Sequence, residues 1–299
     1  MNKNNQKRYI VFVILATILM IVFAFYISDF ISKNKNKDKV LKVAFLNVGQ
    51  GDAIYIQAPN GKQMLIDGGR DRKVISELSR VMPFGDKSID VVIGTHPDAD
   101  HIGGLYYLLK TYKVSVFFEP GATSTSNIYK SLQDTITDKK IPHMIARKGR
   151  SIILDRENNV VLEILYPDKN PIGWESNDAS VITMLSYGNT RVLLTGDSSV
   201  EKELYLVKED PSTPSGQVST LKANILKLGH HGSRTSSAKE FLEKVDPDIS
   251  IISAGKNNSY GHPHPEVIAL LNSLGLKYLE TSKEGTIICE IKKTTYACK

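Results

Sequence analysis

Six of the seven histidines lie in three short segments, THPDADH (95–101), GHHGS (229–233) and YGHPHPE (260–266). Such clustering indicates a site that uses imidazole chemistry. In the first segment His96, Asp98, Asp100 and His101 offer four potential metal ligands between an apolar run and a glycine-rich stretch that opens a predicted helix. This density of ligands favours two adjacent metal ions. A polar turn that caps the helix through Asp100 is the alternative, and it leaves both histidines without a role.

Three further candidates each follow an apolar run that predicts a strand. Asp197 in VLLTGD can bridge two metal ions, and Asp67 in LIDGG can hold a ligand histidine by its far ring nitrogen. His230 in ILKLGHHGS has glycines at 229 and 232 that allow tight backbone turns around it. Taken singly, Asp197 also fits a helix N-cap and Asp67 a turn before glycine. The combination with the histidine clusters favours the metal-site interpretation.

The elements that must position these residues alternate along the chain beyond Val40. Short β-rich runs predict strands, and amphipathic stretches between them predict helices near 71–81, 103–110, 126–137, 199–208, 237–245 and 265–274. The predicted strands are 40–47, 53–57, 63–67, 89–95, 114–118, 160–166, 180–187, 190–195, 224–228, 249–253, 277–280 and 286–291. This order predicts one α/β (α+β) domain whose sheets are covered by helices in layers.

The N-terminus carries a run of nineteen uncharged residues, YIVFVILATILMIVFAFYI (9–27). At 1.5 Å per residue a helix of this length spans about 28 Å, which matches the hydrocarbon core of a bilayer. A cleaved signal peptide is the alternative, but the run is long and no small-residue cleavage site follows it. We therefore expect a single transmembrane anchor, with the catalytic domain outside the cytoplasm.

The distribution of charge helps to divide the chain into segments. Residues 1–39 hold seven basic and two acidic side chains, so they carry +5 of the formal charge of +6 and leave +1 for residues 40–299. The net positive charge of the chain therefore gives no support to a DNA-binding surface on residues 40–299. We predict a cytoplasmic stub and anchor (1–31), a linker (32–39), a hydrolase domain (40–299) and a loop at PSTPSGQ (211–217). No protein partner can be identified.

Several motifs agree in order with one family. LIDGG, THPDADH, LLTGD and GHHGS resemble the metallo-β-lactamase superfamily, and FLNVGQGDA (45–53), NDASV (177–181) and GKNNSYGHPHPEV (255–267) resemble the metallohydrolase domain of the ComEC family of bacterial DNA-uptake channels. The chain is also similar to pneumococcal phosphorylcholine esterase domains. The resemblance covers nearly all of 40–299 and implies a four-layer αββα sandwich.

The resemblance also implies two divalent metal ions, with zinc as the superfamily default. The first ion would be held by His96, Asp98 and Asp197, and the second by Asp100, His101, Asp197 and His230. Asp98 stands where the superfamily usually has histidine, and the usual separate histidine between this motif and Asp197 is missing, since His143 is expected to be structural. This carboxylate-rich set makes manganese plausible as well.

The implied mechanism is attack by a metal-bridged hydroxide on a phosphodiester. Asp100, His262 and His264 are the predicted catalytic residues, the two histidines as groups that hold the phosphate or protonate the leaving oxygen. His231, next to the expected ligand His230, is a candidate for substrate contact, and Ser233 and Asn177 are weaker candidates. The histidines of YGHPHPE also fit an exposed loop made rigid by its prolines.

The resemblance leaves the substrate open. A membrane-anchored phosphodiesterase or nuclease with single-stranded DNA as candidate substrate is expected first. The alternatives are an envelope esterase for small, phosphorylcholine-type diesters, and a non-catalytic tethered binding protein. The two cysteines, Cys289 and Cys298, can pair in a terminal hairpin or remain free thiols.

Overall fold

The computed structural model describes residues 3–35, 39–210 and 219–299, with the side chains of 12–28 in the first of these ranges. Contacts divide the chain into two units between residues 39 and 40. The loop predicted at 211–217 lies outside the described residues. Each unit is described by itself.

The first unit is one helix, α1 (Lys3–Lys35), which contains the predicted transmembrane run and continues into the predicted linker. The side chains of residues 9–11 in that run lie outside the described ones. Across the described residues, no helix combines the length and the apolar character needed to cross a bilayer. The predicted transmembrane helix is therefore not supported by the structure.

The second unit contains two mixed sheets. In the described residues the first sheet has eight strands in the order β15 (Tyr296–Cys298), β14 (Ile287–Ile291), β1 (Leu41–Phe45), β2 (Ile54–Gln57), β3 (Gln63–Ile66), β4 (Ser88–Ile93), β5 (Lys113–Glu119) and β6 (His143–Ile145). Strands β3 to β6 are parallel. The opening strands form antiparallel pairs around β1.

The second sheet has seven strands among the described residues. Their order is β13 (Tyr278–Glu280), β12 (Ile249–Ile252), β11 (Ile225–Lys227), β10 (Thr190–Leu194), β9 (Ile182–Tyr187), β8 (Val160–Tyr166) and β7 (Ser151–Asp155). Strands β10 to β13 are parallel. Each sheet therefore has a block of parallel strands whose carboxyl ends can build a site at one edge.

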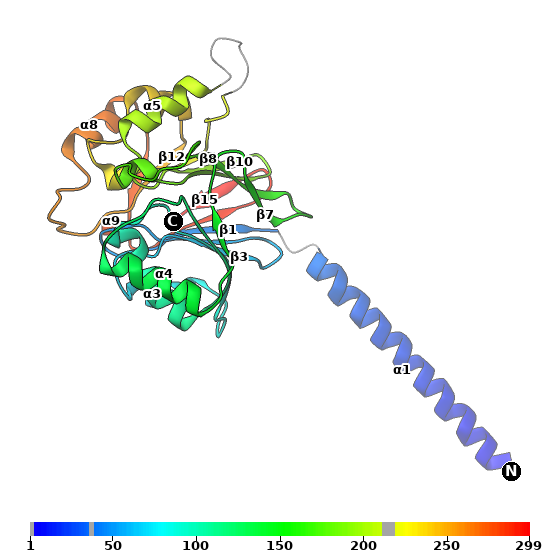
Figure 1. Cartoon of the computed structure of the whole chain (residues 1–299). Coiled ribbons are helices and arrows are strands. Elements are labelled where there is room, and N and C mark those ends of the chain that lie inside the picture. Colours follow the sequence, from blue (N-terminus) through cyan, green and yellow to red (C-terminus); the bar gives the residue numbers. More distant parts are fainter. Residues whose placement is uncertain (1–2, 36–38, 211–218) are drawn as a thin grey trace. The chain divides into compact units, whose positions relative to one another are not determined.

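The two sheets pack face to face, and helices cover their outer faces (Figure 1). Alternation along the strands explains the layers: Val43 and Phe45 join the core between the sheets, whereas Ala44 faces the helices. One sheet is covered by α2 (Lys73–Val81), α3 (Ala99–Thr111) and α4 (Asn127–Asp138). The other is covered by α5 (Val200–Glu209), α7 (Lys239–Val245) and α8 (Pro265–Ser273). The unit thus has the layered two-sheet α/β architecture expected from the sequence.

Some elements differ from the prediction. Strands β6, β7 and β15 were not predicted, because they are short or partly exposed edge strands with weak alternation. Helix α3 begins at Ala99 rather than near 103, since the Asp98 carbonyl accepts hydrogen bonds from the His101 and Ile102 amides. Asp100 and His101 therefore lie in the first turn of a helix and not in a loop.

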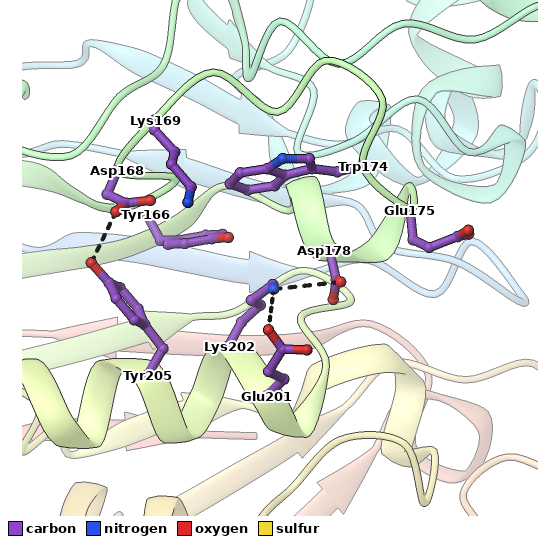
Figure 2. Close-up of a pocket in the computed structure, with 9 residues that line it drawn as sticks. All are labelled: Tyr166, Asp168, Lys169, Trp174, Glu175, Asp178, Glu201, Lys202 and Tyr205. Carbon is purple, nitrogen blue, oxygen red and sulfur yellow. Dashed lines mark hydrogen bonds and ion pairs between the residues drawn. The ribbon is translucent and has the colours of Figure 1, made fainter.

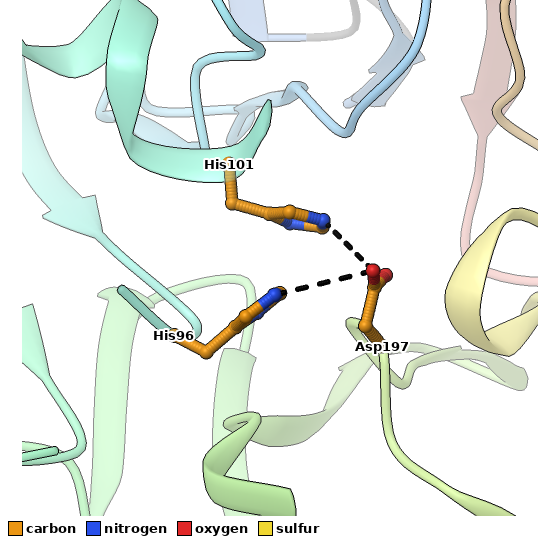
Figure 3. Close-up of side chains that lie close together, drawn as sticks. All are labelled: His96, His101 and Asp197. Carbon is orange, nitrogen blue, oxygen red and sulfur yellow. Dashed lines mark ion pairs between the residues drawn. The ribbon is translucent and has the colours of Figure 1, made fainter. Parts of the chain in front are cut away.

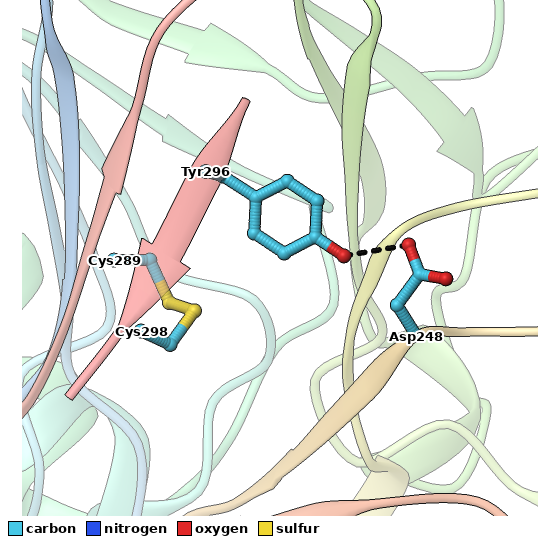
Figure 4. The surroundings of a disulfide bond; sticks show 4 residues. All are labelled: Asp248, Cys289, Tyr296 and Cys298. Atoms are coloured by element: carbon cyan, nitrogen blue, oxygen red, sulfur yellow. Dashed lines mark hydrogen bonds between the residues drawn. A yellow bond between two sulfur atoms is a disulfide. The ribbon is translucent and has the colours of Figure 1, made fainter. Parts of the chain in front are cut away.

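The C-terminal hairpin is closed by a disulfide between Cys289 and Cys298, which are directly opposed in the β14–β15 register (Figure 4). Next to it, the Tyr296 hydroxyl donates a hydrogen bond of 2.6 Å to Asp248, just before β12. This contact joins the edge of one sheet to the other. It lowers the pKa of Asp248 and, together with burial, raises that of Tyr296.

Candidate metal centre

The carboxyl ends of parallel strands from both sheets meet at one edge of the sandwich. Asp67 follows β3 and His96 follows β4 in one sheet, while Asp197 follows β10 in the other. The β3–β4 and β10–β11 pairs are parallel, so the residues after them emerge on the same side of each sheet. Segments far apart in the sequence are thereby brought together.

His96 and His101 both direct their rings at Asp197 (Figure 3). The Nε2 atom of His101 lies 3.2 Å from Asp197 Oδ2, and that of His96 lies 3.9 Å from the same oxygen. Asp98, which is partly exposed, lies 3.7 Å from His96 Nε2 through its own Oδ2. Of the predicted first ligand set, His96 and Asp197 therefore lie together, whereas Asp98 is close to His96 and belongs to none of the described groups whose ligand atoms lie within 4.8 Å of one another.

Asp67 lies behind His101. Its Oδ2 atom is 2.7 Å from His101 Nδ1 and accepts a hydrogen bond of 2.7 Å from the Thr95 hydroxyl. Asp67 has a φ of 59°, a left-handed backbone conformation that aspartate tolerates better than most residues. If the imidazole proton is on Nδ1, Nε2 keeps its lone pair for the centre of the site.

The structure places the two histidines of GHHGS differently from the prediction. His231, and not His230, is the buried member, with Nε2 at 3.3 Å from Asp197 Oδ2 and 3.7 Å from Asp100 Oδ2. Its Nδ1 atom lies 2.9 Å from the Ser253 carbonyl oxygen, so Nδ1–H can be held there. His230 is partly exposed, and its Nε2 lies 3.9 Å from Asp197.

Backbone geometry explains why His231 is buried at the site and His230 is not. His230 and His231 have φ values of 45° and 57°, and Gly232 follows at 79°. Consecutive left-handed residues turn the chain so that the second ring enters the site and the first faces outward. Conformations of this kind are costly for non-glycine residues and persist where surrounding contacts enforce them.

Within the described residues, several buried polar atoms at the centre have no hydrogen-bond partner. Three imidazole Nε2 atoms, from His96, His101 and His231, are buried without a hydrogen-bond partner, as is Asp197 Oδ1. Among the described residues, ligand atoms within 4.8 Å of one another form the sets His96–His101–Asp197 and Asp100–His101–His231. Buried polar atoms left unpaired require an explanation, and nitrogen and carboxylate donors that converge on one point fit divalent metal ions.

The electrostatics of the cluster are those of closely coupled buried groups. Burial would lower the pKa of His101 and His231, but Asp197 and the neighbouring carboxylates outweigh burial and raise both well above the ordinary value. Burial would raise the pKa of Asp197, yet His101 and His231 hold it well below its usual range. His96 shows the opposite shift, because burial and nearby His101 lower its pKa. Negative charge is therefore concentrated on Asp197, where a cation would be stabilised.

Two residues of the cluster were missed by sequence reasoning. Asp52, in the FLNVGQGDA motif, and Lys227, on β11, are both fully buried and form an ion pair. Lys227 Nζ also lies 3.9 Å from Asp197 Oδ1, and Asp52 Oδ1 lies 3.5 Å from His231 Nδ1. Lysine is rarely buried without a partner, so its place in the apolar run ILKLG was the available signal.

Gly51 allows this motif to reach the site. A Cβ atom there would lie 2.0 Å from the Asp100 carbonyl oxygen, and the residue has a φ of 120°. The Asp52 amide donates to the same carbonyl, at 3.3 Å. The close approach brings Asp52 next to the first turn of α3.

His262 and His264 lie on the rim. The His262 ring centroid is 5.3 Å from that of His230 and 4.8 Å from that of His264. Burial and the surrounding histidines lower the pKa of His262 to about 4. His264 Nδ1 accepts a hydrogen bond of 3.0 Å from the Arg234 amide, so its Nε2 can act as a donor.

The weaker candidates also lie in this neighbourhood. Asn177 Nδ2 is 3.5 Å from His230 Nδ1, whereas Ser233 is buried and hydrogen-bonds to Thr235. His143 instead pairs with Glu119 at 3.0 Å. The structure thus places Asn177 beside the rim and directs the Ser233 hydroxyl to its own loop.

A pocket of about 380 Å³ includes Asp178, the residue after Asn177, in its lining (Figure 2). The Tyr166, Trp174 and Tyr205 rings form its apolar part, with Tyr166 and Trp174 stacked at 6.1 Å. The rest of the lining is charged: Asp168, Lys169, Glu175, Asp178, Glu201 and Lys202. The Lys202 ammonium lies 5.6 Å from the Trp174 ring centroid and pairs with Asp178 and Glu201.

A two-sheet α/β sandwich with a histidine–aspartate cluster at the ends of its parallel strands defines a class of metallohydrolases. The model of the metallo-beta-lactamase superfamily matches residues 46–256, and the chain belongs to this superfamily. Membership supports a metal-dependent hydrolase and implies divalent metal ions, with which the observed clusters are compatible.

Among curated proteins the chain resembles ComE operon protein 3 of Bacillus subtilis, with 32% identity over 269 residues, 82% of this chain and 32% of the relative. It also resembles competence protein ComA of Neisseria gonorrhoeae, with 25% identity, covering 91% of this chain and 35% of that protein. The predicted resemblance to the ComEC family is confirmed. The chain spans about a third of the length of these relatives.

One structural neighbour is Igni18, a metallo hydrolase from the archaeon Ignicoccus hospitalis. The TM-score is 0.52 at 15% identity, covering 85% of this chain and 100% of Igni18. At this identity the likeness shows the fold alone.

Proposed function

We propose that this chain is a metal-dependent phosphodiesterase, with single-stranded nucleic acid as its candidate substrate. The observation that carries the proposal is the convergence of three unpaired, buried imidazole nitrogens on the Asp197 carboxylate. The competence relative adds support for a nucleic acid over other phosphodiesters.

The residues would divide into two sets that share Asp197. His96 and Asp98 would hold a first ion, and Asp100, His101 and His231 a second. The mixed imidazole and carboxylate donors suit zinc or manganese. When bound, two such ions would lower the pKa of a water molecule and neutralise negative charge on the phosphoryl group.

The surrounding residues would orient and bind. Asp67 and the Ser253 carbonyl hold the Nδ1 sides of His101 and His231 and so fix the direction of both rings. His264 and His262 stand on the open rim, where they would donate hydrogen bonds to phosphate oxygens or to the leaving oxygen. His230, displaced to the rim by the left-handed turn, joins them as a substrate-facing group.

The first experiment measures metal content and turnover together. The full chain is assayed for zinc and manganese, then for hydrolysis of bis-p-nitrophenyl phosphate and of labelled single-stranded DNA. We expect nearly two ions per chain, hydrolysis of both substrates, and loss of metal and turnover in Asp197→Ala. The matched control is Asp134→Asn, an exposed change on α4 that should leave both unchanged. Full activity in Asp197→Ala would overturn the proposal.

A second candidate function is supported by the aromatic pocket of Figure 2. Its lining combines Trp174, Tyr166 and Tyr205 with four carboxylates and two lysines, and an organic cation would replace the lysines that now lie near the Trp174 ring. A small diester with a choline-type head group would place that head in the pocket and its phosphate at the metal centre. Turnover of p-nitrophenyl phosphorylcholine that falls in Trp174→Ala, with no cleavage of DNA, would favour this function.

Attachment to the cell membrane through residues 9–27, with the catalytic domain outside the cytoplasm, is also part of the proposal. Its support is the uncharged run in the sequence, and the Cys289–Cys298 disulfide fits an oxidising compartment. Fractionation of cells and protease treatment of intact cells test it. Recovery of the full chain from the soluble cytoplasmic fraction would contradict it.

A further inference from the structure

A groove lies between α2 and α3, apart from the metal centre. Two adjoining hollows of about 560 and 430 Å³ share Lys110 and Thr111 and together form what we term the α2–α3 groove. Its lining residues are Arg72, Ile75, Ser76, Ser79, Lys87, Tyr107, Lys110, Thr111, Tyr112, Lys113, Val114, Lys139 and Ile141. The lining contains five cationic side chains and no aspartate or glutamate.

The five cations of the groove are not neutralised. Within the part of the chain that the structure describes, none of them has a carboxylate oxygen within 4.0 Å. They instead contact neutral groups: Arg72 lies 4.8 Å from the Tyr107 ring centroid, and Lys87 lies 4.7 Å from that of Tyr112. Some lysines elsewhere are paired with a carboxylate, such as Lys62 with Asp90 at 2.5 Å.

The gathering of five cations in one groove matters because residues 40–299 are nearly neutral overall. Five unpaired positive charges in one concave surface produce a local potential that the net charge of the domain conceals. A groove of this kind can follow a chain of phosphates, whereas a flat bilayer surface would meet the protruding parts of the domain. The shape therefore favours a strand over a lipid surface.

Helix α3 connects the groove to the metal centre. Its first turn carries Asp100 and His101, and its last turn carries Lys110. At 1.5 Å per residue, Asp100 and Lys110 are about 15 Å apart along the helix axis. Arg72 and Tyr107 lie between these ends, since Tyr107 is on the same helix and the Arg72 guanidinium covers its ring.

We propose that the α2–α3 groove binds the sugar–phosphate backbone of a single-stranded nucleic acid. The four lysines and Arg72 contact successive phosphates of the strand. A strand bound there has one end directed along α3 to the metal centre. This binding needs no metal, and it rests on the proposed function for its choice of a nucleic acid as ligand.

The test uses the full chain and a fluorescein-labelled oligothymidine of about twenty nucleotides, measured by anisotropy with EDTA present. Lys87→Gln/Lys110→Gln removes two charges from the groove. Lys208→Gln/Lys293→Gln removes two exposed charges elsewhere and is the matched control. We expect the groove variant to bind on the order of 10-fold more weakly at 0.1 M salt. We also expect its slope of log affinity against log salt to fall by about 1.4, with the control within about twofold of wild type.

Two results would overturn the inference. One is equal loss of affinity in the groove variant and the control. The other is unchanged oligonucleotide binding in the groove variant together with weakened binding to phosphatidylglycerol vesicles, which would assign the groove to anionic lipid.

Turnover of bis-p-nitrophenyl phosphate separates this inference from the proposed function. It should be unchanged in the groove variant, because the small diester does not reach the groove. Groove-dependent binding without any hydrolysis by the wild type would leave the inference intact and contradict the phosphodiesterase proposal.

Discussion

Lys227 and Asp52 form a fully buried ion pair directly behind the candidate metal centre. The Lys227 ammonium also donates a hydrogen bond of 3.3 Å to the Gly196 carbonyl, in the turn that presents Asp197. Burial would raise the pKa of Asp52, but Lys227, His231 and His101 together outweigh burial and lower it. Lys227 therefore compensates the charge of the buried Asp52 carboxylate and connects the turn after β10 to the FLNVGQGDA segment.

Breaking this pair should be costly. We expect Lys227→Met to lower the free energy of unfolding by about 3–5 kcal/mol, because it leaves the buried Asp52 carboxylate unpaired. Lys227→Met/Asp52→Asn should recover part of the loss. Lys222→Met, which removes an exposed lysine paired with Asp246, is the control and should cost less than about 1 kcal/mol. Denaturant unfolding in EDTA measures all three, and equal effects at Lys227 and Lys222 would contradict the prediction.

The two adjacent histidines of GHHGS should behave differently. We expect His231→Ala to lose bound metal, because its Nε2 faces Asp100 and Asp197 from a buried position. His230→Ala should retain the metal and show altered turnover only. Metal analysis after dialysis, with circular dichroism as the check on folding, distinguishes them. Loss of metal in His230→Ala alone would restore the assignment made from the sequence.

Asp67 should act through His101. Asp67→Asn is expected to weaken metal affinity by about 10–100-fold. The neutral amide is a weaker hydrogen-bond acceptor than the carboxylate, so it holds His101 Nδ1–H less firmly. Competition with a chelator of known affinity measures the change. Asp134→Asn serves as the control, and an affinity equal to wild type in Asp67→Asn would remove Asp67 from the supporting set.

Stability should depend on pH through Glu203, which lies buried on α5. Burial raises the pKa of Glu203 from 4.5 to about 7, against the effect of hydrogen bonds from the Ser237 and Ala238 amides. A folded-state pKa above the unfolded value means that the contribution is complete below pH 4.5 and is lost as the pH rises to about 7. The loss is about 3 kcal/mol at most.

Unfolding measured across this pH range in wild type and Glu203→Gln tests the prediction. The stability of the variant relative to wild type should rise as the pH increases from 4.5 to about 7. Glu240→Gln, an exposed change on α7, should follow wild type. A constant difference between wild type and Glu203→Gln would show that Glu203 does not titrate in this range.

The disulfide should stabilise the C-terminal hairpin. It closes a sequence separation of 9 residues, for which loop entropy gives about 2–3 kcal/mol. We expect Cys289→Ala/Cys298→Ala to lower Tm by about 5–10 °C. Reductant should lower the Tm of the wild type to that of the variant and leave the variant unchanged. A wild-type Tm insensitive to reductant under unfolding conditions would contradict this expectation.

The sequence by itself determined the superfamily, the order of most strands and helices, and the gathering of His96, Asp98, Asp100 and His101 on one segment. These features depend on spacing within a few residues, so periodicity and local ligand density carry them. Short edge strands such as β6 and β15 escaped prediction, because their pairing partners rather than their own patterns stabilise them.

The tertiary structure decided whether His230 or His231 faces the centre of the site. His230 and His231 have the same chemistry and adjacent positions, and only the left-handed backbone enforced by their surroundings turns the second ring inward. Asp52 and Lys227 are far apart in the sequence, so their ion pair and the unpaired cations of the α2–α3 groove emerge only when strands and helices pack. Contacts between distant segments depend on packing in three dimensions, which local sequence patterns do not encode.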